Sequence, residues 1–310
     1  MRNFKGGLCS YVGMTKRNVF LFFKDKTTLF FSMLAPLIVF FLYVIFLKDT
    51  YLSSLKESLN AIEGYYDLKD IESLANLWLL AGILGTASIT VALNSLQVMV
   101  RDKNLKIDYD YTSSPISGVI VILSYFTSAL LNTFMITGGI LTIGLGITSI
   151  MGNTYLSIGK GFMLYLLTLL GSASSVIVMM VIVSFFKKTT SLAAFSGIVS
   201  AAIGFIIGAY IPLGNFSKEI QGVLSLVPGS HVACLYRNLL MNGVLEHINT
   251  SLNGIDNGMF YTNVSLAFAL NLNVFSLEAS KHFMMIYIVS SIGLAFILNV
   301  VLYRKTIKRR

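Results

Sequence analysis

The sequence is poor in charge, cysteine, proline and tryptophan. Of its 310 residues only 12% are charged, and it holds two cysteines, four prolines and one tryptophan. A soluble domain carries about 25% charged residues, so this composition, which is 55% hydrophobic, excludes an ordinary soluble protein. Two cysteines make no disulfide framework. The composition predicts an all-α polytopic membrane protein.

Motifs that hold nucleotides or carry catalysis are also missing. The chain has no G-x-x-x-x-G-K-[ST] phosphate loop and no G-x-S-x-G nucleophile turn. The stretch "SIGKGF" at Ser157–Phe162 lacks the first glycine and a Ser or Thr after the lysine. The histidines His231, His247 and His282 have no paired ligand spacing. We therefore expect no catalytic residue, no metal site and no cofactor bound by this chain itself.

Six apolar runs are long enough to cross about 30 Å of hydrocarbon as helices. The six predicted spans are Thr27–Leu47, Asn76–Val100, Gly118–Thr148, Gly161–Phe186, Ser191–Leu213 and His282–Tyr303. None of them contains Asp, Glu, Lys or Arg. Ion-coupled carriers usually need ionisable groups inside the membrane. The absence disfavours an ion-coupled carrier or a channel, which is kept as an alternative. A membrane-embedded enzyme is a further alternative, and the missing catalytic motifs argue against it.

Basic residues are distributed unevenly between the two sides that the spans define. The N-terminal segment, the loops after the second and fourth spans, and the C-terminal tail hold sixteen of the 23 Lys and Arg residues and four of the 14 acidic ones. The net charge is therefore +12 on this side and −3 on the other. By the positive-inside rule both termini are cytoplasmic. Membrane topology thus accounts for the overall charge of +9, and no nucleic-acid partner is expected.

Two segments outside the spans are expected to lie against the bilayer. Residues 1–26 interleave apolar residues such as Leu8 and Tyr11 with basic ones, which predicts an amphipathic interfacial helix before the first span. On the outer side, residues 214–281 begin with an apolar stretch broken at Pro228-Gly229. Two half-length helices on either side of that turn would form a re-entrant hairpin. The part from His247 onward is rich in Asn, Ser and Gly and is predicted to be a surface excursion.

Uncharged polar residues and glycines mark two of the spans. Polar side chains recur on one face of the second span, at Thr86, Thr90, Asn94 and Gln97. They predict either hydrogen bonds between helices or the lining of a path for an amphiphilic substrate. Gly204 and Gly208 in the fifth span form a Gly-x-x-x-Gly pattern, which favours close helix contact within the chain or in a dimer.

The loop after the second span, "RDKNLKIDYDYTSSPIS" at residues 101–117, is long and carries both signs of charge. Aromatic residues of the kind enriched at protein interfaces accompany the charges. We expect a docking surface there, made of Arg101, Asp102, Lys103, Lys106, Asp108, Tyr109, Asp110 and Tyr111. Ser114 and Pro115 are expected to begin the third span as its N-cap and first residue. A solvated loop without a partner is the alternative.

The order of these features resembles the permease subunits of type-2 ABC exporters. The resemblance rests on "KRNVFLFFKDKTTLFFSMLAPLIVFFLYVIFL", on the charged loop that ends "SSPIS", and on "LSLVPGSHVACLYRNLL" between the fifth and sixth spans. It implies a second permease copy or paralogue and a cytoplasmic ABC ATPase subunit that binds ATP and Mg. It also implies that Lys16–Lys26 is an elbow helix, Arg101–Tyr111 a coupling helix and Glu219–Gly243 a pair of re-entrant helices. The first, second and fifth spans would flank the substrate route.

The resemblance also bears on substrate and location. Compact polysaccharide-exporting members tend to lack a polar excursion such as the one that follows Gly243, so drugs, peptides or lipids are the expected substrates. Abundant Lys, Asn, Ile and Phe suggest a low-GC bacterium and hence the plasma membrane. The resulting prediction is a multi-pass permease subunit that exports an amphiphile with ATP hydrolysed by another chain.

Overall fold

The structure, a computed structural model, describes residues 2–57, 67–114, 116–152, 154–275 and 277–308. These residues are almost entirely helical. The elements are α1 (Arg2–Lys24), α2 (Lys26–Leu42), the π-helical turn η1 (Tyr43–Leu47), α3 (Lys48–Glu57), α4 (Leu68–Ser95), α5 (Gln97–Asn104), α6 (Asp108–Ser113), α7 (Gly118–Met151), α8 (Ile158–Ser184), α9 (Thr189–Ile206), the 3-10 turn η3 (Leu213–Asn215), α10 (Lys218–Leu224), α11 (Pro228–Ser251), α12 (Met259–Ala267), β1 (Leu272–Val274), β2 (Leu277–Ala279) and α13 (Lys281–Lys308).

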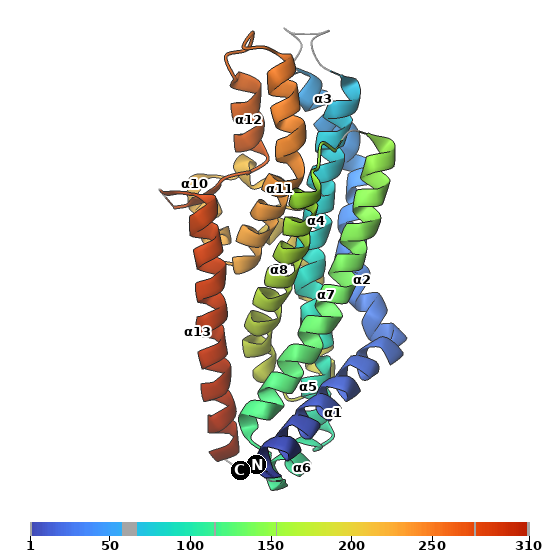
Figure 1. Cartoon of the computed structure of the whole chain (residues 1–310), viewed down its shortest axis with the longest axis vertical. Helices are drawn as coiled ribbons and strands as arrows, with labels where there is room; N and C mark the ends of the chain where they lie inside the picture. Colours follow the sequence, from blue (N-terminus) through green and yellow to red (C-terminus); the bar gives the residue numbers. More distant parts are fainter. Residues whose placement is uncertain (1, 58–66, 115, 153, 276, 309–310) are drawn as a thin grey trace.

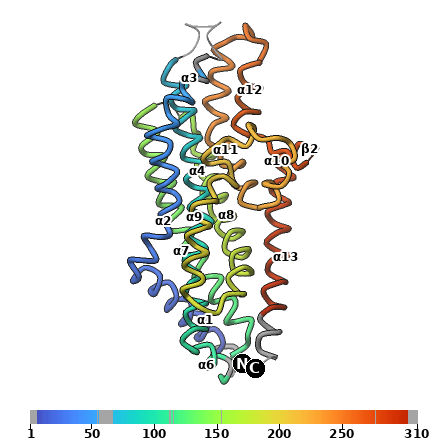
Figure 2. The backbone as a smooth tube through the Cα atoms, turned by 180° about the vertical axis from the view of Figure 1, so that it is seen from behind, coloured from blue at the N-terminus to red at the C-terminus, as the bar shows by residue number. Residues whose placement is uncertain are grey.

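The long helices run side by side in one elongated bundle (Figure 1). The start of α1, the end of α13 and the short helices α5 and α6 lie at the same end, which we call the basal end. The opposite end, which we call the apical end, carries α3, the end of α11 and the start of α12. Seen from behind, α9 stops part of the way up the bundle, and α10 follows above it (Figure 2).

Six helical segments of the described chain are long and apolar enough to cross a membrane, as the hydropathy pattern predicts. They are Lys26–Ser53, Leu68–Asn104, Gly118–Met151, Ile158–Ser184, Thr189–Ile206 and Lys281–Leu302. The chain is therefore a multi-pass helical membrane protein. The second segment is central, since 94% of its most apolar 18-residue stretch is buried in the bundle. For the last segment the buried share is 17%. Between the first two of these segments, residues 58–66 lie outside the described residues.

The predicted interfacial segment is a helix, α1, that ends one residue before Asp25 caps α2. It crosses the bundle obliquely at the basal end (Figure 1). Its Tyr11 hydroxyl lies 2.7 Å from Thr127 Oγ1 of α7. Met14 and Phe22 are buried, while Leu8 and Phe20 are exposed. This two-faced burial is that of an amphipathic helix.

The fifth span ends earlier than predicted, at Ile206 instead of Leu213. Gly208 lies beyond the helix with φ +71°. The Ala209 N–H donates to Gly204 O and the Gly208 N–H to Phe205 O, which is the bond pattern of a Schellman termination with glycine at its left-handed position. Gly204 and Gly208 therefore do not share a helix face. A Cβ on Gly204 would meet the ring of Tyr210 in the same chain, so this glycine permits an intramolecular contact.

The predicted hairpin of two half-length helices is wrong in its proportions. Its first helix, α10, has 7 residues and its second, α11, has 24. Pro228 and Gly229 do not form the turn; Pro228 is the first residue of α11, where its missing N–H costs nothing. A Cβ on Gly229 would lie 2.5 Å from Ile89 Cδ1, so glycine allows α11 to approach α4 closely.

The expected surface excursion is ordered over most of its length. After α11 the chain forms α12 and a small antiparallel hairpin in which Leu272 pairs with Ala279 and Val274 with Leu277. The ring of Phe268 packs edge-to-face against Trp78 of α4, with ring centroids 5.6 Å apart. The excursion is thus attached to the second span by an aromatic contact.

Candidate functional site

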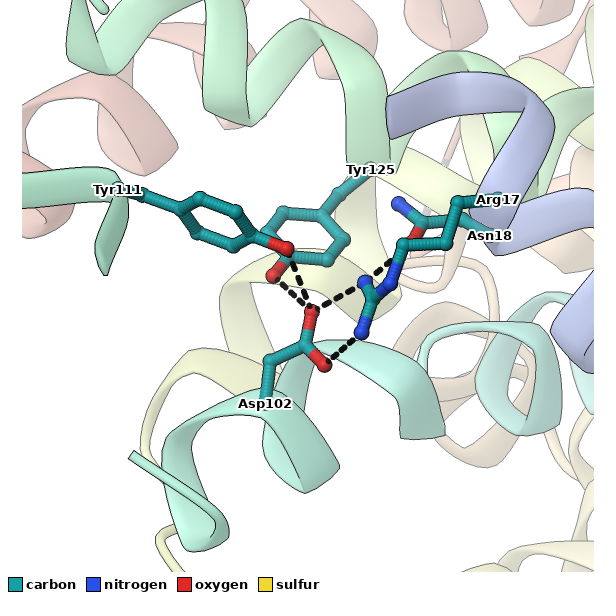
Figure 3. Close-up of polar contacts among 5 residues, drawn as sticks. All are labelled: Arg17, Asn18, Asp102, Tyr111 and Tyr125. Atoms are coloured by element: carbon teal, nitrogen blue, oxygen red, sulfur yellow. Dashed lines mark hydrogen bonds and ion pairs between the residues drawn. The ribbon is translucent and has the colours of Figure 1, made fainter. Parts of the chain in front are cut away.

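A buried carboxylate lies at the centre of the basal end. Asp102, in the last turn of α5, has no exposed side-chain surface and pairs with Arg17 of α1. Arg17 Nη2 donates to Oδ1 at 2.7 Å and Nη1 to Oδ2 at 2.8 Å (Figure 3). A two-pronged arginine–carboxylate pair of this kind is among the stronger hydrogen-bonded contacts in proteins. It joins two segments that are 85 residues apart in sequence.

Two tyrosines complete the surroundings of this carboxylate. The Tyr125 hydroxyl, from α7, donates to Asp102 Oδ2 at 2.7 Å, and the Tyr111 hydroxyl, from α6, approaches the same oxygen at 3.5 Å. Arg17 Nη1 also donates to Asn18 Oδ1 at 3.0 Å. All five side chains converge on one point between α1, α5, α6 and α7 (Figure 3). We call these residues the basal cluster.

The electrostatics of the basal cluster favour a charged pair. The hydrogen bond to Asp102 raises the pKa of Arg17 well above its usual range, although burial opposes the rise. Burial raises the pKa of Tyr111, and the negative charge of Asp102 adds to the effect. The guanidinium therefore stays charged and the phenol stays a hydrogen-bond donor at any physiological pH.

Lys103 and Lys106 shape the segment that carries the cluster. Lys103 Nζ donates to Ser184 O, at the end of α8, at 2.9 Å, where a cation complements the helix dipole. Lys106 has φ +61°. The Ile107 N–H donates to Asp102 O and the Lys106 N–H to Lys103 O, so a Schellman turn ends α5 and redirects the chain into α6.

The predicted docking residues therefore divide into two groups. Asp102, Lys103 and Tyr111 contact the bundle itself, which corrects the expectation that the whole set faces a partner. Lys106, Tyr109 and Asp110 are exposed, and Tyr109 keeps 48% of its surface. Asp108 is half-buried, and Arg101 is exposed beside a cavity described below.

The third span begins later than expected. Ser117, not Ser114, is the N-cap of α7, and its side chain accepts a hydrogen bond from Ile120 N. Ser114 instead ends α6, where its hydroxyl donates to Tyr111 O at 3.0 Å. Pro115 lies outside the described residues.

A cavity of about 380 Å³ opens beside the basal cluster. It lies between the α1–α2 junction, α4, α5 and the start of α9. The polar residues of its lining are Asp25, Thr28, Asn94, Ser95, Gln97, Arg101, Asn104 and Thr189. Gln97 Nε2 donates to Asn94 Oδ1 at 2.6 Å, and Thr28 Oγ1 donates to Asp25 Oδ2 at 2.9 Å. The first, second and fifth spans thus meet around a space with both polar and apolar walls.

The four predicted path residues do not act as one surface. Asn94 and Gln97 line the cavity. Thr86 and Thr90 are fully buried, and their hydroxyls are bonded to backbone oxygens, including a 2.9 Å bond from Thr90 to Ser32 O of α2. Thr90 therefore forms an interhelical hydrogen bond, as the alternative interpretation predicts. Only Asn94 and Gln97 are placed to line a substrate path.

Charged residues that the sequence did not single out prove important. In the sequence, Arg17 is one of six basic residues among the first 26 and has no distinguishing pattern. Arg237 of α11 is fully buried, and its Nη2 donates to Ile207 O and Gly208 O at 2.7 Å each. A cation at these carbonyls satisfies the end of α9 inside the bundle. The available signal was that Arg237 is the one arginine between Arg101 and Arg304.

The described residues offer little for a metal or cofactor. They contain no group of three or more His, Cys, Asp or Glu side chains placed to hold a metal ion. Cys9 is exposed and Cys234 is buried, and both are free thiols. What the basal end can do chemically is bind charged or polar groups through its exposed residues and its cavity.

Comparison with known proteins adds no relative: no family model, no curated protein and no solved structure matches this chain.

Proposed function

We propose that this chain is the membrane-spanning permease subunit of an ABC exporter of the type-2 kind. In this proposal it moves an amphiphilic substrate, such as a drug, a peptide or a lipid, across a bacterial plasma membrane. The basal end faces the cytoplasm, and both termini lie there. A separate ATPase subunit binds ATP and Mg, and a second permease copy or paralogue completes the pathway.

The observation that carries the proposal is the two-sided α5–α6 segment. Its inner side is fixed to three other helices through Asp102, Lys103 and Tyr111. Its outer side presents Lys106, Tyr109 and Asp110 to solvent at the basal end. A rigidly held element with exposed charged and aromatic groups is suited to pass a movement of a docked partner to the spans. A loosely attached loop would change its own conformation instead.

The cavity supports the same proposal. It opens at the end that we assign to the cytoplasm, and its walls come from the three spans that flank the substrate route in the resemblance. Leu21, Phe22 and Val98 place apolar surface beside the amide and carboxylate groups. Such a mixed lining suits an amphiphile better than a bare ion.

Purification of the full chain from its native membrane tests the proposal. We expect an ATPase subunit to co-purify and the complex to hydrolyse ATP in a vanadate-sensitive way. An ion-coupled carrier or a channel would instead transport in proteoliposomes without a partner chain, driven by an ion gradient. Gradient-driven transport by the chain alone, with no associated ATPase, would exclude the proposal.

A further inference from the structure

A second recess lies in the apical half of the bundle, and its lining is more apolar than that of the cavity at the basal end. It has a volume of about 570 Å³ and lies between α8, α11 and α13. Its wall is mainly apolar, with Leu166, Leu167, Leu170, Leu235 and Met285 among its residues. Leu166 is 51% exposed and Met285 42% exposed, so the recess opens sideways along two membrane spans. We call it the lateral groove.

The mouth of the lateral groove is basic. Lys160 lies in the first turn of α8, and Lys281 is the first residue of α13. Neither lysine forms an ion pair with another described residue. Glu246 of α11 also lines the groove, so the three side chains together carry one net positive charge.

The position of these lysines is unusual. They lie on the side of the membrane where acidic residues outnumber basic ones. Both also lie at helix N-termini, which already carry partial positive charge and favour anions over cations. Two unpaired cations at two helix N-termini create a strong local preference for a negatively charged group.

Glu246 supplies hydrogen-bond acceptors in the groove, because its exposed carboxylate is among the lining residues. The groove therefore combines cations, a hydroxyl acceptor and an apolar wall.

We propose that the lateral groove binds one anionic phospholipid with a hydroxyl-bearing headgroup, a phosphatidylglycerol, from the apical leaflet. An acyl chain lies against Leu166, Leu170 and Met285. The phosphate lies between Lys160 and Lys281, and a headgroup hydroxyl donates to the carboxylate of Glu246. This assignment does not depend on the transport function proposed above.

Native mass spectrometry of the delipidated full chain tests the assignment. Palmitoyl-oleoyl phosphatidylglycerol is expected to give a one-lipid adduct, and the matching phosphatidylcholine a much weaker one. Glycerol 3-phosphate, which has the charge without the acyl chains, is expected to give none. Equal binding of the two phospholipids, or binding of glycerol 3-phosphate alone, would overturn the proposal.

Paired variants locate the site. Lys160→Gln with Lys281→Gln should weaken phosphatidylglycerol binding roughly fivefold per lysine, the effect of one cation beside an anionic lipid. Lys69→Gln with Lys218→Gln removes the same charge from exposed apical positions outside the groove and should change nothing. The proposal fails if both double variants lose affinity equally, or if neither does.

A bulky substitution tests the apolar wall. Leu166→Trp fills the groove and should remove phosphatidylglycerol binding, whereas Leu169→Trp, at a similarly exposed position outside the groove, should retain it. If the groove were instead covered by a second copy of the chain, Leu166→Trp would change the oligomeric state and leave lipid binding unaltered. That result would also overturn the proposal.

Discussion

The second span has a buried aspartate at each end, and the two are held differently. At the basal end, Asp102 is bound by both prongs of Arg17 and by Tyr125. At the apical end, Asp70 Oδ2 lies 3.0 Å from His247 Nδ1 of α11. The side chains of Asp102 and Asp70 are 0% and 1% exposed, whereas Arg17 keeps 32% and His247 43% of its surface.

Helix position explains why the basal aspartate needs the stronger partner. Asp70 lies in the first turn of α4, where the helix dipole stabilises a negative charge. Asp102 lies in the last turn of α5, where the dipole opposes one. Arg17 is always charged, but His247 is charged only when protonated. The comparison indicates that the basal end is fixed permanently and the apical end less firmly.

The largest effect is expected from Arg17→Met. It leaves Asp102 buried without its counter-ion, which costs about 3–5 kcal/mol of unfolding free energy when one partner of a buried pair is removed. The measurement is SDS-induced unfolding of the full chain in mixed micelles. Arg101→Met is the matched control, because Arg101 is exposed at the same end, and a surface change of this kind costs within about 0.5 kcal/mol.

The double variant Arg17→Met with Asp102→Leu sharpens this first prediction. Replacing both charges with apolar groups of similar size is often nearly neutral, so much of the lost stability should return. If the double variant is as unstable as the sum of the two single variants, the pair is not coupled and the account of the basal cluster is wrong.

A smaller loss is expected from Tyr125→Phe. The change removes the 2.7 Å hydrogen bond to Asp102 and keeps the ring. Hydrogen bonds to charged groups contribute about 1.5–3 kcal/mol. Tyr111→Phe, which loses only a 3.5 Å contact, is the control and should cost clearly less in the same unfolding assay. Equal losses would mean that the distances do not reflect the strength of the two bonds.

The apical pair should respond least. His247→Gln removes a partner that is 43% exposed, and Asp70 keeps the support of its helix N-terminus. We expect a loss of about 1 kcal/mol or less, as for exposed ion pairs. If His247→Gln lost as much unfolding free energy as Arg17→Met in the same SDS-induced unfolding assay, the two ends would not differ in how firmly they are held.

The sequence predicted the spans better than it predicted their ends. Apolar runs located all six membrane-spanning segments, because hydropathy is a local property. The end of α9 depends on the left-handed Gly208 and on carbonyls bound by Arg237, which lies 29 residues away, so no local pattern announced it. The mixed charges of residues 101–111 predicted one docking surface, although three of its eight residues, Asp102, Lys103 and Tyr111, contact the bundle.

The basal cluster was missed for the same reason. Asp102 looked like one charge among several in a loop, and Arg17 like one basic residue among many. Only the tertiary structure brings them together across 85 residues. An acidic residue two positions after a long apolar span was the available clue, since such a group must be paired if the helix continues into the bundle.

The central claim is that the outer side of α6 docks an ATPase while its inner side only holds the fold. The most direct measurement uses Tyr109→Ala with Asp110→Ala in the purified chain. The account predicts wild-type unfolding, because both side chains are exposed, and at least tenfold weaker ATPase association, since interface anchors and charges contribute about 2 kcal/mol or more. Wild-type association and substrate-stimulated hydrolysis in this variant would contradict it.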